Sequence, residues 1–110
     1  MDEVGTGRPK SDTITKNMQV VTIFEVCYMS MYYVYLLRSL KDPTKTYIGH
    51  TNNLEQRLEK HNSGGSIATE DFRPWKLVAY IALDSAEKAL SLEQYLKVGS
   101  GHAFAKRRLW

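Results

Sequence analysis

Cysteine is almost absent from this sequence and proline is scarce: the 110 residues include one cysteine, Cys27, and three prolines. A single cysteine excludes an internal disulfide and a zinc site built from several cysteines, so nothing indicates an oxidising compartment. Apolar residues make up 43% and charged residues 25% of the chain, which excludes a collagen-like or wholly disordered protein. At this length we expect one domain with a small core.

A long uninterrupted apolar segment is also missing. The run over residues 20–37 approaches the length of a membrane span, but it contains Thr22, Glu25 and Ser30. A carboxylate inside a bilayer is costly, so we do not interpret this run as a transmembrane helix. The chain begins with a mixed-charge segment and not with a signal peptide pattern. We therefore expect no membrane association and a cytoplasmic location.

The chain divides near Met31. Residues 1–30 carry three basic and four acidic side chains, whereas residues 31–110 carry twelve and eight. Residues 1–19 resemble a flexible tail, residues 20–29 could add a strand, and Met29 or Met31 could equally be the start of the functional protein. We therefore predict an N-terminal extension, 1–30, and a basic domain, 31–110. A basic domain favours a polyanionic partner, although surface lysines more often serve solubility.

The order of elements in the second segment predicts an α+β fold. Tyrosine-, valine- and leucine-rich runs predict strands, Thr, Asn and Asp positions predict helix caps, and Gly-rich stretches predict helix ends. The order is β-β-α-β-α, with two strands forming an antiparallel hairpin. The expected elements are strands at 32–38 and 46–49, a helix capped by Thr51 or Asn52 and running to about His61, a strand at 75–83, and a helix capped by Asp84 and ending before 99–101.

Three polar residues fall on or beside the apolar faces of the two predicted helices. Arg57 and His61 are neighbours at i,i+4 on the edge of a leucine stripe, and Glu93 lies within the apolar arc of the second helix. Each alone could lie at the rim of a core face with its charged end in solvent. A shared cleft would explain all three together, because a buried charge is costly unless it is paired or binds a metal.

Two tyrosine triplets carry the strongest signal. Tyr33-Val34-Tyr35 and Tyr47-Ile48-Gly49 are separated by eleven residues. They resemble the two halves of the GIY-YIG nuclease signature, with Tyr33 in place of the first glycine. Residues 53–61 resemble the helix that carries the catalytic arginine of that family, and residues 89–93 resemble the segment with its metal-binding glutamate. The resemblance covers residues 32 to about 108, and it is to small single-domain members and to the nuclease domain of the excision-repair incision subunit.

The resemblance implies a small three-stranded antiparallel sheet flanked by helices, and a metal-dependent endonuclease that cleaves DNA, as in DNA repair. It makes Tyr35 and Tyr47 the signature tyrosines, Arg57 the arginine, His61 an auxiliary histidine and Glu93 the ligand of Mg²⁺ or Mn²⁺. We assign water as the nucleophile and Tyr35 as its general base, with Tyr47 hydrogen-bonded nearby. A free tyrosine has a pKa of about 10, so we expect Arg57 and a cation to lower the pKa of Tyr35. Arg57 would hold the scissile phosphate through its fork of donors.

Substrate choice is less defined. Lys45 and Lys76 are candidates for contacts with nucleic-acid phosphates or for plain surface residues, and the same alternative applies to His102. We expect selectivity for DNA structure, no sequence preference, or specificity supplied by a partner protein. The alternatives are a nucleic-acid-binding module with little cleavage and an accessory subunit that positions another nuclease.

Overall fold

The sheet is three-stranded and antiparallel, as predicted. The computed structural model describes residues 31–110, so the possible strand within residues 20–29 lies outside the described residues. The strands are ordered β2-β1-β3, with β1 in the centre and β2 and β3 at the two edges. The elements are β1 (Tyr32–Ser39), β2 (Thr46–Thr51), α3 (Leu54–Ser63), a 3₁₀ turn (Glu70–Phe72), β3 (Trp75–Leu83), α4 (Ala86–Lys97) and α5 (Gly99–Arg108). This arrangement confirms the α+β class.

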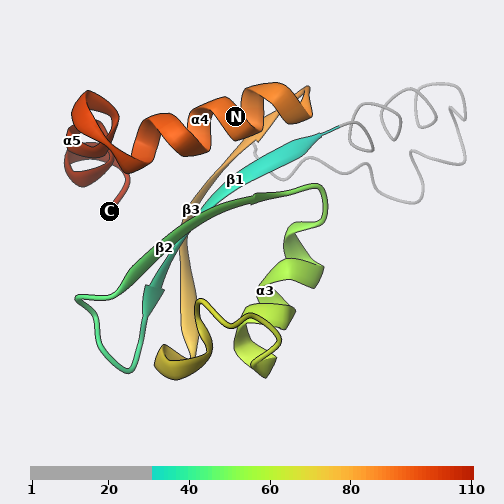
Figure 1. Cartoon of the computed structure of the whole chain (residues 1–110), viewed down its shortest axis with the longest axis vertical. Helices are drawn as coiled ribbons and strands as arrows, with labels where there is room; N and C mark the ends of the chain where they lie inside the picture. The colour runs from blue at the N-terminus through green and yellow to red at the C-terminus, as the bar shows by residue number, and fades with distance from the viewer. Residues whose placement is uncertain (1–30) are drawn as a thin grey trace, which may run out of the picture. The chain divides into compact units, whose positions relative to one another are not determined.

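Helices cover both faces of the sheet (Figure 1). Successive residues of β1 point to opposite faces, and all four from Val34 to Leu37 are fully buried. Val34 and Leu36 belong to the cluster formed with α4 and α5, whereas Tyr35 and Leu37 belong to a second cluster beside α3. The alternation therefore places Tyr35 on the α3 side of the central strand.

The helix caps differ from those predicted. Asn53, and not Thr51 or Asn52, caps α3: its side chain accepts a hydrogen bond from the Gln56 backbone N–H at 3.1 Å. The helix continues past His61 to Ser63 and ends at Gly64, whose φ of 88° favours glycine. Ser85, and not Asp84, caps α4. In both cases several cap-forming residues are adjacent, and backbone geometry selects one of them.

The sequence did not predict α5, which follows α4 after the single residue Val98. A side chain at Gly101 would place its Cβ 1.8 Å from the backbone oxygen of Tyr95, so only glycine allows the two helices to approach this closely. The glycines that were expected to end the helical region instead mark the junction between two helices. Within residues 31–110, no helix combines the length and apolar character that a membrane span requires.

Candidate active site

A hydrogen-bonded chain links the central strand to α3. The Tyr35 hydroxyl lies 2.8 Å from His61 Nε2, and His61 Nδ1 lies 2.7 Å from Thr69 Oγ1. The Thr69 hydroxyl faces the Ser66 carbonyl, which can only accept. We assign Thr69 as the donor to Ser66, 3.5 Å away, and as the acceptor from His61 Nδ1–H, an assignment in which Nε2 accepts the Tyr35 proton. All three side chains of the chain Tyr35–His61–Thr69 are buried.

Burial shifts the pKa of both Tyr35 and His61. Desolvation, reinforced by Tyr47, raises the pKa of Tyr35 to about 12, although Arg57 acts in the opposite direction. Arg57 therefore acts on the pKa of Tyr35 in the direction that we expected, but burial outweighs the guanidinium, so the net shift in the protein without metal or substrate is upward. Desolvation, assisted by Arg57 and Lys60, lowers the pKa of His61 below its usual 6.5. At neutral pH the pair is a phenol facing a neutral imidazole.

Because burial raises the pKa of the Tyr35 phenol, we expect the folded protein to lose stability at alkaline pH. The unfolded chain releases the Tyr35 proton near pH 10, whereas the folded chain retains it to about pH 12. The folded state therefore binds more protons between these values, and its stability falls by ~2–3 kcal/mol as the pH rises across them. Urea unfolding at pH 9 to 12 should show this extra slope in the wild type but not in Tyr35→Phe. Parallel curves for the two proteins would contradict the assignment.

Gly49 allows the two signature tyrosines to meet. It is the cross-strand partner of Tyr35, and a Cβ at this position would lie 2.6 Å from the Tyr35 hydroxyl oxygen and 2.9 Å from Cε2 of Tyr47. The Tyr47 ring lies 4.9 Å from the His61 ring and 6.2 Å from the Tyr35 ring, between centroids. Tyr47 therefore lies near Tyr35, as predicted, because a glycine leaves both rings room, but the hydrogen bond expected of Tyr47 is not among those that residues 31–110 form.

We expect Gly49→Ala to destabilise the fold by about 1–3 kcal/mol, the usual cost of overpacking a core. The added methyl group must displace the Tyr35 phenol or the Tyr47 ring. Thermal unfolding monitored by circular dichroism measures the loss. Gly65→Ala is the matched control, because there the nearest atom is a carbon of the flexible Lys60 side chain. Equal stability of the two variants would contradict the close approach at Gly49.

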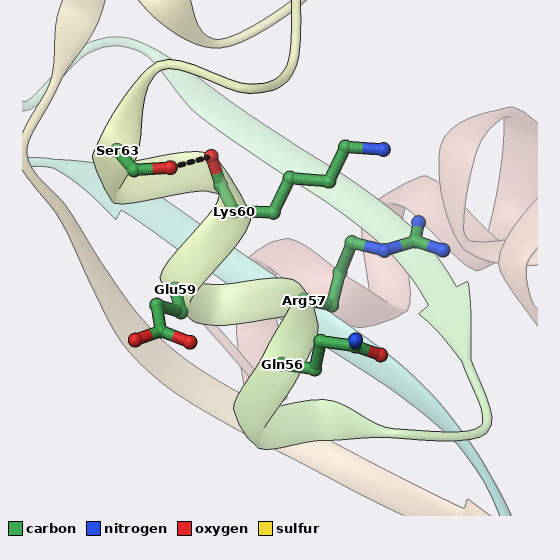
Figure 2. A pocket seen from close by; sticks show the side chains of 5 residues that line it. All are labelled: Gln56, Arg57, Glu59, Lys60 and Ser63. Atoms are coloured by element: carbon green, nitrogen blue, oxygen red, sulfur yellow. Dashed lines mark hydrogen bonds between the residues drawn. The ribbon is translucent and has the colours of Figure 1, made fainter.

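Arg57 and Lys60 form a pair of cations on the solvent side of α3. With Gln56, Glu59 and Ser63 they line a hollow of about 560 Å³. Figure 2 shows the Arg57 and Lys60 side chains extending from α3 in the same direction, away from Glu59. Arg57 also acts on the Tyr35 hydroxyl, so one guanidinium is close both to solvent and to the buried phenol. This placement suits a group that holds a phosphate beside Tyr35.

Glu93 lies on α4 and is held by two partners. His50 Nδ1–H donates to Oε1, and Lys97 Nζ donates to Oε2 at 2.5 Å. Burial raises the pKa of the Glu93 carboxyl, but Lys97 and His50 together lower it below its usual range, so the group is ionised at neutral pH. The hollow that Arg57 lines includes neither His61 nor Glu93. Glu93 reaches His50 of β2 from the α4 side of the sheet, and its charge still raises the pKa of Tyr35.

The donor set at Glu93 fits a hydrated Mg²⁺ ion. Within residues 31–110, no three His, Cys, Asp or Glu side chains gather around a common point. Mg²⁺ retains several waters and needs only one or two carboxylates. The side chain of Glu93 is 12% exposed and that of Lys97 is 47% exposed, so the lysine can turn into solvent and free one carboxylate oxygen.

Lys45 and Lys76, the lysines predicted to contact nucleic-acid phosphates, lie apart from Arg57 and Glu93. Lys45 Nζ lies over the Phe72 ring, 5.3 Å from its centroid. Lys76 lies on β3, at the opposite edge of the sheet from Tyr47 on β2. Among the described residues, neither lysine shares a hydrogen bond or an ion pair with Arg57 or Glu93. His102 lies on α5, where it lines two adjoining hollows beside β2.

Comparison with known proteins identifies the family of this chain. The family model described as the GIY-YIG catalytic domain matches residues 31–105. The chain belongs to the GIY-YIG endonuclease superfamily. This GIY-YIG domain is 43% identical over 68 residues to a UPF0213 protein of Clostridium perfringens, covering 61% of this chain and 71% of that one. A UPF0213 protein of Bacillus halodurans with a solved structure is 35% identical, covering 69% of this chain and 80% of that one, with a TM-score of 0.43.

A second group of relatives is much longer. The structure-specific endonuclease subunit SLX1 of Debaryomyces hansenii is 40% identical over 73 residues, which are 60% of this chain but 21% of the relative. The corresponding protein of Candida dubliniensis is 36% identical over 87 residues, with 73% and 29% covered. This GIY-YIG domain therefore spans between a fifth and a third of the length of these SLX1 relatives.

Several residues of this GIY-YIG domain were not identified from the sequence. Thr69, which orients His61, lies in an irregular segment, and a lone buried threonine carries no pattern. His50 contacts Glu93 from 43 positions away, a pairing that only the tertiary fold creates. Lys60, beside Arg57, was recoverable, because residues three apart on a helix share a face.

Proposed function

We propose that this chain is a metal-dependent endonuclease that hydrolyses DNA phosphodiester bonds, with Tyr35 and His61 acting together on the attacking water. The observation that carries the proposal is the 2.8 Å hydrogen bond between the Tyr35 hydroxyl and the bare Nε2 of His61, beside the Arg57 guanidinium. A phosphodiester must be held, attacked in line and relieved of negative charge. This site has a residue type suited to each of these tasks.

Proton transfer through the pair has to accompany the attack. The pKa of Tyr35 is about 12 and that of His61 is below 6.5. Because the pKa of Tyr35 stands well above that of His61, the neutral pair is favoured and a free phenolate does not accumulate. In the proposed step, the Tyr35 oxygen takes a proton from water while its own proton passes to His61 Nε2. As the water oxygen bonds to phosphorus, the bond from phosphorus to the 3′ oxygen breaks and its electron pair leaves with that oxygen, so the water does not have to lose its proton to a strong base beforehand.

Arg57, with Lys60 beside it, would hold two non-bridging oxygens of the scissile phosphate and fix its distance from Tyr35. Tyr35 is fully buried, so DNA binding must first move a covering side chain; half-buried Tyr47 and Arg57 are the candidates at hand. Glu93 would hold Mg²⁺ or Mn²⁺ once Lys97 turns away, and His50 would keep the carboxylate oriented. A cation bound there supplies positive charge for the departing 3′ oxygen.

The SLX1 relatives are named as subunits of structure-specific endonucleases, which supports a branched or otherwise distorted DNA substrate and a partner protein for this chain. The partner would supply the choice of substrate, because side chains that hold a phosphate carry no information about base sequence. The second candidate function is an accessory module with little cleavage of its own. The word "subunit" in the names of the SLX1 relatives favours this function.

A panel of labelled substrates tests the proposal. The full chain is incubated with duplex, nicked, flap, four-way and single-stranded DNA, and with single-stranded RNA, in Mg²⁺, Mn²⁺ or EDTA. We expect internal cuts in at least one DNA, present with metal and absent with EDTA. Folded protein that binds DNA but leaves every substrate intact, with or without metal, would support the accessory function instead.

A further inference from the structure

A second cationic surface lies beside β2, separate from the Arg57 side of α3. One hollow of about 280 Å³ includes Tyr47 and Lys97, and a second of about 470 Å³ includes Arg38 and Lys106. Both share Thr46, His102 and Trp110, so they form one continuous depression, which we name the α5 groove. The α5 groove runs from a signature tyrosine to the basic C-terminal half of α5.

The α5 groove has positive charge but no acidic lining residue. Its cations are Arg38, Lys97 and Lys106, and of these only Lys97 forms an ion pair within residues 31–110, with Glu93. Lys106 and His102 are exposed on adjacent turns of α5. Uncompensated cations in a concave surface focus the field and attract anions.

Arg38 gives the clearest evidence for an anion-binding surface. Its Nε atom is buried and has no hydrogen-bond partner within residues 31–110, although buried donors are nearly always paired. Its guanidinium carbon lies 5.5 Å from the centroid of the Trp110 ring, so the aromatic ring fixes its position in the groove. A donor held in this way, with no acceptor, suits an anion that enters from outside.

We propose that the α5 groove binds the phosphate backbone of the nucleic-acid strand as it continues away from the scissile phosphate. This inference rests on the proposed function, because the groove begins at Tyr47 and at Lys97, the partner of Glu93. Arginine, lysine and threonine side chains are the usual contacts to phosphate oxygens, and Thr44 and Thr46 line the groove with the cations. An acidic protein partner would not require a groove that begins beside the proposed active site, at Tyr47 and Lys97.

Binding measured without turnover tests this proposal. In EDTA, the affinity of the full chain for a labelled single-stranded oligonucleotide is followed as salt is varied. The variants are Arg38→Gln, Lys106→Gln and the double variant, and Arg107→Gln is the matched control, because Arg107 is exposed on α5 but does not line the groove. Losing two phosphate contacts should weaken binding about 20-fold at 0.1 M salt and reduce the salt slope by about 1.4.

A double variant that matches Arg107→Gln in affinity and slope would overturn the proposal, as would equal loss of binding to oligonucleotide and to polyglutamate. Circular dichroism confirms folding, and if Arg38→Gln unfolds, exposed His102→Gln and Lys106→Gln give the same test. The two proposals fail separately. If the double variant loses binding and the wild type does not cleave, the groove proposal stands and the nuclease proposal fails. If the wild type cleaves and the double variant binds as before, the nuclease proposal stands and the groove proposal fails.

Discussion

Replacing Tyr35 with phenylalanine is expected to lower the single-turnover rate of DNA cleavage by about 10²–10⁴-fold, the usual contribution of general acid–base catalysis. The change removes only the hydroxyl that bonds His61, and the ring continues to fill the core beside α3. DNA affinity should change little, because Arg57 and Lys60 remain. His61→Gln should give a loss of similar size.

Tyr95→Phe is the matched control, since Tyr95 is 48% exposed on α4 and does not belong to the Tyr35–His61 pair. The pH dependence adds a second readout. The wild-type rate should fall as the pH drops below the pKa of His61, which lies below 6.5, because the protonated imidazole cannot accept the phenolic proton. A Tyr35→Phe rate within twofold of the Tyr95→Phe rate would contradict the role of the pair.

Glu93→Gln is expected to abolish the response to metal. The amide retains the shape of the side chain but cannot neutralise a divalent cation, and the ion pairs with His50 and Lys97 are lost with it. Cleavage in Mg²⁺ or Mn²⁺ should fall by at least about 10²-fold, a loss of ~3 kcal/mol in transition-state stabilisation. Calorimetric titration with Mn²⁺ should detect one site in the wild type and none in the variant.

Glu87→Gln, an exposed change in the first turn of the same helix, controls for the loss of one negative charge. Because Lys97 competes for Glu93 in the protein without metal, Lys97→Gln should tighten Mn²⁺ binding in the same titration. Unchanged Mn²⁺ binding in Glu93→Gln would place the cation elsewhere and contradict the assignment.

The sequence was sufficient to predict the three strands of the sheet. The strand predicted at residues 75–83 is β3 as observed, and the strand predicted at 32–38 is one residue shorter than β1. These strands carry strong patterns because their side chains alternate between two filled faces or are buried throughout. The helix caps were displaced by one or two residues, because neighbouring Asn, Ser, Thr and Asp side chains are equally able to cap.

The site was predictable where its residues belong to one motif, and not where they are joined by tertiary contacts. Tyr35, Tyr47, Arg57 and Glu93 come from the family resemblance, and their catalytic roles stay predictions. The pairing of Glu93 with His50 depends on how α4 crosses β2, and the support of His61 by Thr69 depends on the turn after α3. The lowering of the Tyr35 pKa by Arg57 was predicted, but the larger upward effect of desolvation was not, because burial inside the core cannot be judged from neighbouring charges in a sequence.

The most direct measurement compares the wild type with the double variant Tyr35→Phe/Glu93→Gln, each purified identically beside the control Tyr95→Phe/Glu87→Gln. Trace nuclease from the host would give metal-dependent cuts in all three preparations, so only the comparison assigns cleavage to this chain. We expect the wild type and the control to cut the preferred DNA in Mg²⁺ at equal rates and the site variant to leave it intact. Equal cutting by all three proteins, or none by the folded wild type on any substrate, would contradict an endonuclease centred on Tyr35 and Glu93.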